Sequence, residues 1–119
     1  MTEVLDSQAY LAKMLGAYRP GKEKYLAFYD HRIGAITLDP AMMLVPLDDH
    51  LVHRGDGIFE AVKCVNRKLY LLKEHMERLQ RSAKAITLTP PCPWEEVTEL
   101  VKDVARATNE DNAMLRIYM

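Results

Sequence analysis

Residues 53–88 read HRGDGIFEAVKCVNRKLYLLKEHMERLQRSAKAITL and form the centre of the expected fold. Within this stretch, Phe59 to Val65 and Lys68 to Leu72 are β-prone runs separated only by Asn66-Arg67. Two such runs joined by two turn-forming residues predict a tight β-hairpin. Because side chains alternate across a strand, the first run has two different faces. One face carries Phe59, Ala61 and Lys63, and the other carries Glu60, Val62 and Cys64.

A helical pattern follows between Lys73 and Ala85. Its apolar residues recur at the spacing of one helical face, namely at Met76, Leu79, Ala83 and Ile86. His75, Arg78 and Ser82 form a polar stripe along the border of that face. A guanidinium in this position is well suited to hold a phosphate through paired, charge-assisted hydrogen bonds. The alternative is a solvated Arg78 that pairs with Glu74, four residues earlier.

Two further features of the same stretch allow two interpretations each. Gly55 and Gly57 let the backbone turn sharply or approach a ligand closely, although glycines at such spacing also serve as simple turn formers. Lys63 is either a pocket residue or an edge-strand lysine that discourages aggregation.

On the C-terminal side, the breaker Pro90-Pro91-Cys92-Pro93 is followed by a second amphipathic helix with acidic residues in its first turn. Its apolar stripe consists of Val97, Leu100, Val101 and Val104. Asn109 to Asn112 predicts a turn, and Met114 to Met119 predicts a strand that reaches the C-terminus. We interpret that ending as a sign of a longer protein.

On the N-terminal side, residues 1–22 are expected to form an arm with a short helix. Ser7 is predicted to cap this helix, which extends to about Leu15. Residues 38–49 contain two prolines among mixed apolar residues and are expected to be irregular.

A hairpin between these two segments completes the pattern, with strands predicted at Tyr25–Tyr29 and Ile33–Thr37. Hairpins, then helices, then a strand indicate an α+β domain with an antiparallel sheet and flanking helices. This order argues against a doubly wound α/β fold.

Composition and charge exclude several classes of protein. The chain has 119 residues, 49% of them hydrophobic and 28% charged, which suits a single folded domain. A net charge of -1 gives no long-range attraction for nucleic acid or anionic lipid. Apolar runs are too short to cross a membrane and the N-terminus lacks a basic signal segment, so we expect a cytoplasmic protein. Neither the two cysteines nor the four histidines show metal-ligand spacing, so no metal site is predicted.

HRGDGIFEAVK and KLYLLKEHMERLQRSAKAITL together resemble the N-terminal part of the class IV aminotransferases, the fold-type IV pyridoxal phosphate enzymes. The patterns GDGxFE and HxxRLxxSA carry this resemblance, which runs from about Tyr25 to Met119. The family includes branched-chain amino acid aminotransferases, D-amino acid aminotransferases and aminodeoxychorismate lyase. The resemblance implies that residues 23–119 form the small N-terminal domain. It also implies that pyridoxal phosphate lies between this domain and a larger C-terminal one.

The resemblance also implies roles for individual residues. Arg78 would bind the cofactor phosphate, with His75 and Ser82 as packing neighbours. Phe59 matches an aromatic residue placed against the substrate side chain. The other implied pocket residues are Ala61 and Lys63, Arg116, which resembles an arginine near the substrate in branched-chain members, and Arg54, which stands where some of them have tyrosine. No residue of this chain is assigned as catalytic, because the family's catalytic lysine lies in the larger domain.

For the complete protein the resemblance implies a homodimeric aminotransferase that moves an amino group between an amino acid, branched-chain-like, and a 2-oxo acid. The isolated chain is expected to be inactive. Two alternatives stay open: an aminodeoxychorismate lyase, and a non-enzymatic assembly or phosphate-ligand module that retains the fold.

Overall fold

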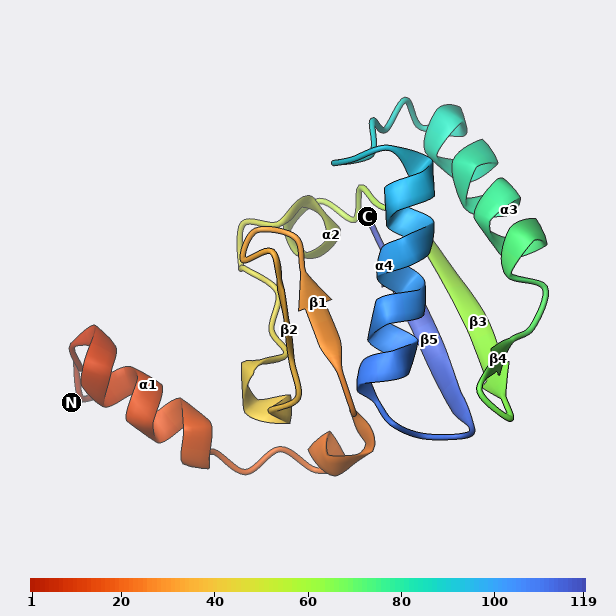
Figure 1. Cartoon of the computed structure of the whole chain (residues 1–119). Helices are drawn as coiled ribbons and strands as arrows, with labels where there is room; N and C mark the ends of the chain where they lie inside the picture. Colours follow the sequence, from red (N-terminus) through yellow and green to blue (C-terminus); the bar gives the residue numbers. More distant parts are fainter.

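The computed structural model describes residues 1–119 and places two long helices against a small antiparallel sheet, with a second sheet beside it (Figure 1). The helices are α1 (Ser7–Gly16), α2 (His50–His53), α3 (Leu72–Ala85) and α4 (Trp94–Ala107), with 3-10 helices η1 (Lys22–Lys24) and η2 (Pro40–Met42). The strands are β1 (Phe28–Asp30), β2 (Ala35–Thr37), β3 (Phe59–Val65), β4 (Lys68–Leu69) and β5 (Ala113–Tyr118). The predicted α+β class is confirmed. None of the helices is long and apolar enough to span a bilayer.

Strand β3 is the centre of the larger sheet, whose order is β4-β3-β5, while β1 and β2 form the smaller sheet. The turn between β3 and β4 holds Asn66 at φ 49° and Arg67 at φ 62°, and two positive φ angles match the right-handed twist of a two-residue hairpin. Strand β5 pairs along the length of β3, from Phe59 opposite Tyr118 to Cys64 opposite Ala113. The predicted tight hairpin and C-terminal strand are both confirmed.

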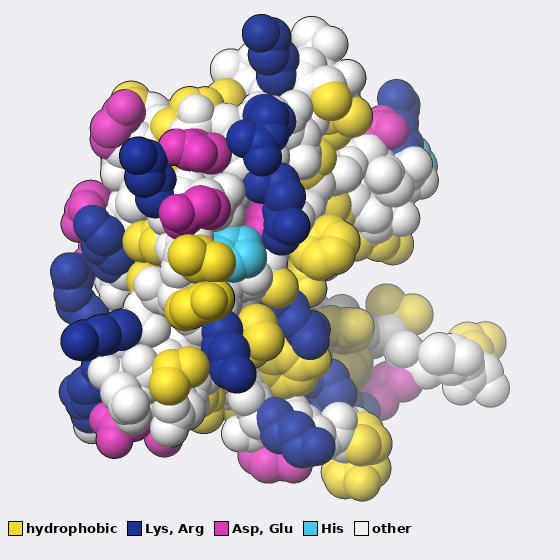
Figure 2. Space-filling view, turned by 90° about the vertical axis from the view of Figure 1, so that its right-hand side faces the viewer, with side chains coloured by type: hydrophobic (Ala, Val, Ile, Leu, Met, Phe, Trp, Pro, Cys, Tyr) yellow, Lys and Arg dark blue, Asp and Glu magenta, His cyan; other side chains and the backbone are white.

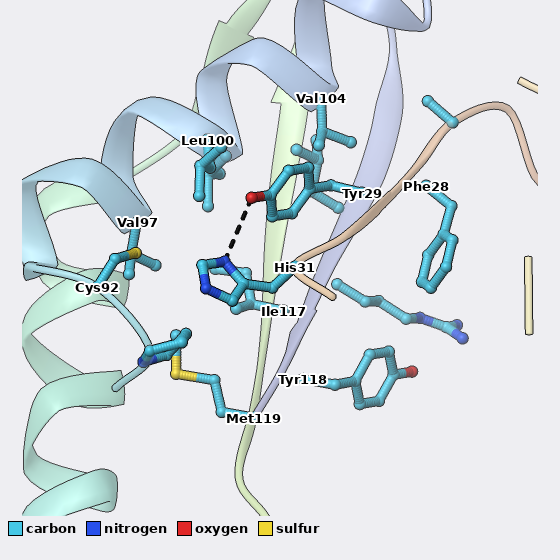
Figure 3. Close-up of a pocket in the computed structure, with 15 residues that line it drawn as sticks. Phe28, Tyr29, His31, Cys92, Val97, Leu100, Val104, Ile117, Tyr118 and Met119 are labelled. Atoms are coloured by element: carbon cyan, nitrogen blue, oxygen red, sulfur yellow. Dashed lines mark hydrogen bonds between the residues drawn. The ribbon is translucent and has the colours of Figure 1, made fainter. Parts of the chain in front are cut away.

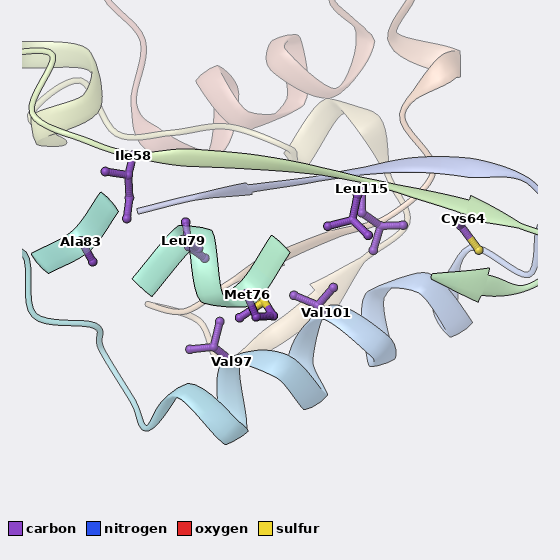
Figure 4. Close-up of a cluster of buried hydrophobic side chains, with 9 residues drawn as sticks. Ile58, Cys64, Met76, Leu79, Ala83, Val97, Val101 and Leu115 are labelled. Carbon is purple, nitrogen blue, oxygen red and sulfur yellow. The ribbon is translucent and has the colours of Figure 1, made fainter. Parts of the chain in front are cut away.

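The hydrophobic core lies between this sheet and the two long helices (Figure 4). Strand β3 directs Val62 and Cys64 into it, whereas the intervening Lys63 is exposed. The other core residues are Ile58, Met76, Leu79, Ala83, Val97, Val101 and Leu115. Because α3 and α4 both lie on one side of the sheet, the opposite face of β3 and β5 is left without a helical cover (Figure 1).

Two predictions around α3 are wrong in detail. The run Lys68–Leu72 is a strand only as far as Leu69, because Leu71 adopts a left-handed conformation with φ 51° and the helix starts at Leu72. Leu72 then packs against the core. Ile86 was expected on the buried helical face but is exposed, since the helix ends one residue earlier at Ala85.

The N-terminal half also differs from expectation in its details. Asp6 caps α1 in place of Ser7: its Oδ1 accepts a hydrogen bond from the Ala9 amide at 2.8 Å. The segment expected to be irregular contains η2, which is capped by Asp39. The helix α1 buries none of its residues and projects away from the sheets, as Figure 1 shows. The boundary of the arm at residue 22 stays a prediction.

Candidate functional site

A cluster of three side chains lies where α3 packs against β3. Glu60 points from β3 towards the helix and is only 3% exposed. Arg78 donates from Nε to Glu60 Oε1 at 2.5 Å and from Nη2 to Oε2 at 2.8 Å. His75 places its Nδ1 2.8 Å from the same Oε2. The alternative pairing of Arg78 with Glu74 is therefore wrong, because the carboxylate that Arg78 contacts belongs to a strand 18 residues earlier in the chain.

The electrostatics of this cluster keep both main partners charged. The two hydrogen bonds from Arg78 hold the pKa of Glu60 below its ordinary value, with a further contribution from His75, although burial acts in the opposite direction. Contact with Glu60 in turn raises the pKa of Arg78. The carboxylate and the guanidinium therefore form an ion pair at neutral pH.

The Arg78 guanidinium has donors that Glu60 does not use. Its side chain is 59% exposed, although the carboxylate that it contacts is buried. Of the five N–H groups of an arginine, the Nη1 pair and one Nη2 hydrogen remain available to an anion. Lys and Arg side chains gather in a column on the side of the molecule that carries α3 (Figure 2). An exposed, charged fork in such surroundings fits a phosphate group.

The other predicted site residues of the two strands lie on the uncovered face of the sheet. Phe59 and Lys63 of β3 are exposed there, as the predicted alternation requires. Ala61 lies directly opposite Arg116 of β5, which puts the Arg116 side chain on the same face. We call this surface the open face. It consists of Phe59, Ala61, Lys63, Met114, Arg116 and Tyr118.

Tyr118 and Met114 were missed from the sequence. Tyr118 stacks on Phe59 with ring centroids 6.3 Å apart and an angle of 28° between the planes. The period-2 pattern of the C-terminal strand could have placed Met114, Arg116 and Tyr118 on one face. The register that sets Tyr118 against Phe59 has no such local signal.

The predicted site residues do not form one cluster. Arg78 contacts the side of β3 that faces α3, whereas Phe59, Ala61 and Lys63 lie on the open face. Arg54 ends α2, is exposed and makes no side-chain hydrogen bond. The chain therefore presents an anion-binding fork and an aromatic, basic face on two sides of the same strand.

The two glycines before β3 have structural reasons to be there. Gly55 adopts φ 70°, a conformation that other residues rarely adopt. A Cβ atom on Gly57 would lie 1.9 Å from Leu51 Cδ2 and 2.8 Å from the Met119 carbonyl oxygen. These contacts favour the turn-forming interpretation over ligand approach.

An apolar cavity of about 270 Å³ lies between β1, α4 and β5, and it was not anticipated from the sequence (Figure 3). Of its 15 lining residues, 12 are hydrophobic. The Tyr29 hydroxyl lies 3.2 Å from His31 Nδ1 within it. Among the predicted site residues only Arg116 contributes to its lining. The cavity suits an apolar group and contains no pair of cations for an anion.

Comparison with known proteins places this geometry in a family. Residues 57–119 match the family model for amino-transferase class IV. The chain is 31% identical over 122 residues to the chloroplastic D-amino-acid transaminase of Arabidopsis thaliana, covering 96% of this chain and 33% of that protein. It is 33% identical over 82 residues to the bifunctional aminodeoxychorismate lyase / D-amino acid transaminase of Mycobacterium tuberculosis, covering 67% of this chain and 28% of that protein.

Solved structures give the same result. The branched-chain amino acid aminotransferase of Escherichia coli aligns with a TM-score of 0.62 and 27% identity over 71% of this chain and 29% of that one. The branched-chain enzyme of T.th. complexed with N-(5'-phosphopyridoxyl)-L-glutamate aligns with a TM-score of 0.63 and 26% identity, over 71% of this chain and 30% of that one. The chain belongs to the class IV aminotransferase family, as its motifs indicated. It spans about a third of the length of these relatives.

Proposed function

We propose that this chain is the N-terminal part of a pyridoxal phosphate-dependent aminotransferase that moves an amino group between an amino acid and a 2-oxo acid. The observation that carries this proposal is the Arg78 guanidinium, which the buried Glu60 holds on one edge and which is exposed on the other. Membership of the class IV family supports it.

In this proposal Arg78 binds the cofactor phosphate through its free donors, and the exposed fork fits that group. When bound, pyridoxal phosphate supplies the electron sink for the chemistry at the substrate amino group. The raised pKa of Arg78 keeps the guanidinium charged at any pH at which such an enzyme works. His75 contributes by holding Glu60, and Ser82 packs beside the same helix.

The proposed substrate pocket uses the open face. The stacked rings of Phe59 and Tyr118 provide an apolar wall for a substrate side chain and exclude water from it. Lys63 and Arg116 supply positive charge for a carboxylate, and Ala61 leaves room between them. Arg54 is proposed to border the pocket. We also propose that the catalytic lysine lies outside this chain, so that the isolated chain is inactive.

The proposed substrate is a branched-chain-like amino acid, supported by Arg116 on the open face and by the likeness to branched-chain enzymes of known structure. Two relatives favour other substrates within the family: a D-amino acid, or aminodeoxychorismate in a lyase reaction. The proposal includes a homodimer and a cytoplasmic location.

Amino transfer by the complete protein is the direct test. The protein, loaded with pyridoxal phosphate, is incubated with 2-oxoglutarate and either L-leucine or D-alanine, and glutamate is measured. Formation of glutamate from L-leucine supports the proposal, and formation from D-alanine alone corrects the substrate. Consumption of aminodeoxychorismate without transfer favours the lyase. Loss of all three activities in a folded protein favours the non-enzymatic module.

A further inference from the structure

The carboxylate of Glu60 makes more contacts with α3 than an ordinary ion pair. Its Oε1 accepts from Arg78, and its Oε2 lies 2.8 Å from both Arg78 Nη2 and His75 Nδ1. His75 and Arg78 are three residues apart and therefore lie on the same face of the helix. A single buried carboxylate on β3 thus fixes two α3 side chains at once.

We infer that Glu60 is a positioning residue that fixes the orientation of Arg78 for phosphate binding, with His75 holding the carboxylate in place. This inference rests on the proposed binding of the cofactor phosphate by Arg78. Two parallel hydrogen bonds define the plane of the guanidinium, whereas a single contact would let it rotate.

Fixing Arg78 in advance lowers the entropy that binding must remove. Arginine is among the side chains that lose the most rotamer freedom when they are ordered. In a protein where the fork is already held by Glu60, a phosphate meets donors in a fixed arrangement, and less of the interaction energy is spent on ordering them. Glu60 is itself suited to this role because it lies on the central strand and is almost completely buried.

Charge alone predicts the opposite effect. The negative charge of Glu60 partly cancels that of Arg78, so by Coulomb's law its removal should strengthen the binding of a phosphate. A purely structural role is the other alternative. Yet a buried ion pair is often no more stabilising than apolar residues of the same size, and this one leaves the guanidinium exposed to solvent. The direction of the change in phosphate affinity therefore separates positioning from both alternatives.

The experiment compares how the complete protein, without cofactor, binds pyridoxal phosphate and pyridoxal, which lacks the phosphate. The ratio of the two dissociation constants, from fluorescence titration, isolates the contribution of the phosphate. We expect Glu60→Gln to reduce this preference for the phosphorylated form about tenfold. Glu74→Gln removes the same charge from exposed α3 without touching a hydrogen bond of Arg78, and it should leave the ratio unchanged or slightly raised.

His75 offers a second, independent pair of variants. His75→Leu removes the group that holds Glu60 Oε2 and should lower the ratio, whereas His75→Asn retains a donor at that position and should restore most of it. The double variant Glu60→Gln/Arg78→Ala should show no lower ratio than Arg78→Ala alone, because both changes act through the same fork.

The outcomes distinguish this inference from the proposal on which it rests. An Arg78→Ala variant with an unchanged ratio would show that Arg78 does not bind the phosphate. If Arg78→Ala lowers the ratio while a folded Glu60→Gln variant keeps or raises it, the positioning role of Glu60 is wrong. Circular dichroism and the melting temperature establish folding. Should Glu60→Gln fail to fold, equal ratios for His75→Leu and His75→Asn would overturn the inference instead.

Discussion

The ring of Phe59 stacks on the ring of Tyr118, with centroids 6.3 Å apart, on the face of the β3–β5 sheet that neither α3 nor α4 covers. The two residues are 66% and 55% exposed. With the equally exposed Met114, they form an apolar patch on the open face. Contiguous apolar surface of this kind is typical of an interaction site.

We therefore predict that the 119-residue chain self-associates through the open face. Static light scattering over a range of concentrations should detect dimers or larger species. Tyr118→Lys should shift the equilibrium towards the monomer, because it places a charge in the patch. Tyr70→Lys, a change at an exposed tyrosine outside the patch, should have no such effect. A wild-type chain that stays monomeric at high concentration would contradict this prediction.

A second prediction concerns the core. Leu79 is fully buried between α3 and the sheet, so Leu79→Ala should lower the free energy of unfolding by about 2 to 5 kcal/mol. The midpoint of urea denaturation measures this loss. Glu77 lies on the exposed side of the same helix, and Glu77→Ala should change the free energy of unfolding by no more than about 0.5 kcal/mol. Equal effects of the two substitutions would mean that the helix packs through another face.

The third prediction follows from the lowered pKa of Glu60. A carboxyl group whose pKa is lower in the folded protein than in the unfolded chain stabilises the fold above the ordinary value near 4.5. This stabilisation is lost as the pH falls through the lowered pKa. Between about pH 5 and pH 2, the wild-type chain should thus lose more stability than Glu60→Gln does. Thermal melts at several pH values measure the difference, and parallel curves would rule out the proposed contribution of Glu60.

Gly57 provides a fourth prediction. A Cβ atom there would overlap Leu51 and come too close to the Met119 carbonyl, so Gly57→Ala should destabilise the chain by about 1 to 3 kcal/mol. Gly16 ends α1 with no atom near its would-be Cβ. Gly16→Ala should therefore be neutral or stabilise by up to about 1 kcal/mol. Chemical denaturation of the two variants tests both, and a neutral Gly57→Ala would show that the close packing of Leu51 is not required.

The fifth prediction concerns Lys63, which is exposed on the open face. Since the proposed catalytic lysine lies outside this chain, incubation with pyridoxal phosphate, borohydride reduction and peptide mapping should label Lys63 no more than Lys68, another exposed lysine of the same hairpin. A stoichiometric pyridoxyl adduct on Lys63 alone would overturn the assignment of this residue to the substrate pocket.

Much of the fold could be predicted because it depends on short-range spacing. The apolar residues Met76, Leu79 and Ala83 follow the helical period, and all three are buried as expected. The two-residue turn at Asn66-Arg67 was equally predictable, since few connections of that length suit the twist of two strands. Predictions failed where a local pattern reached an element boundary: Leu71 and Leu72 belong to a β-prone run but lie at the start of α3.

The sequence by itself determined which residues lie on which face of an element, and its motifs indicated the family and the importance of Arg78. Only the tertiary structure decided what Arg78 contacts. Glu60 is 18 residues away along the chain, and their meeting depends on how α3 lies across β3. The same holds for Phe59 and Tyr118, which stack because β5 pairs with β3 in one particular register. Periodicity depends on the geometry of one helix or strand, whereas these contacts depend on the packing between elements, which no local spacing specifies.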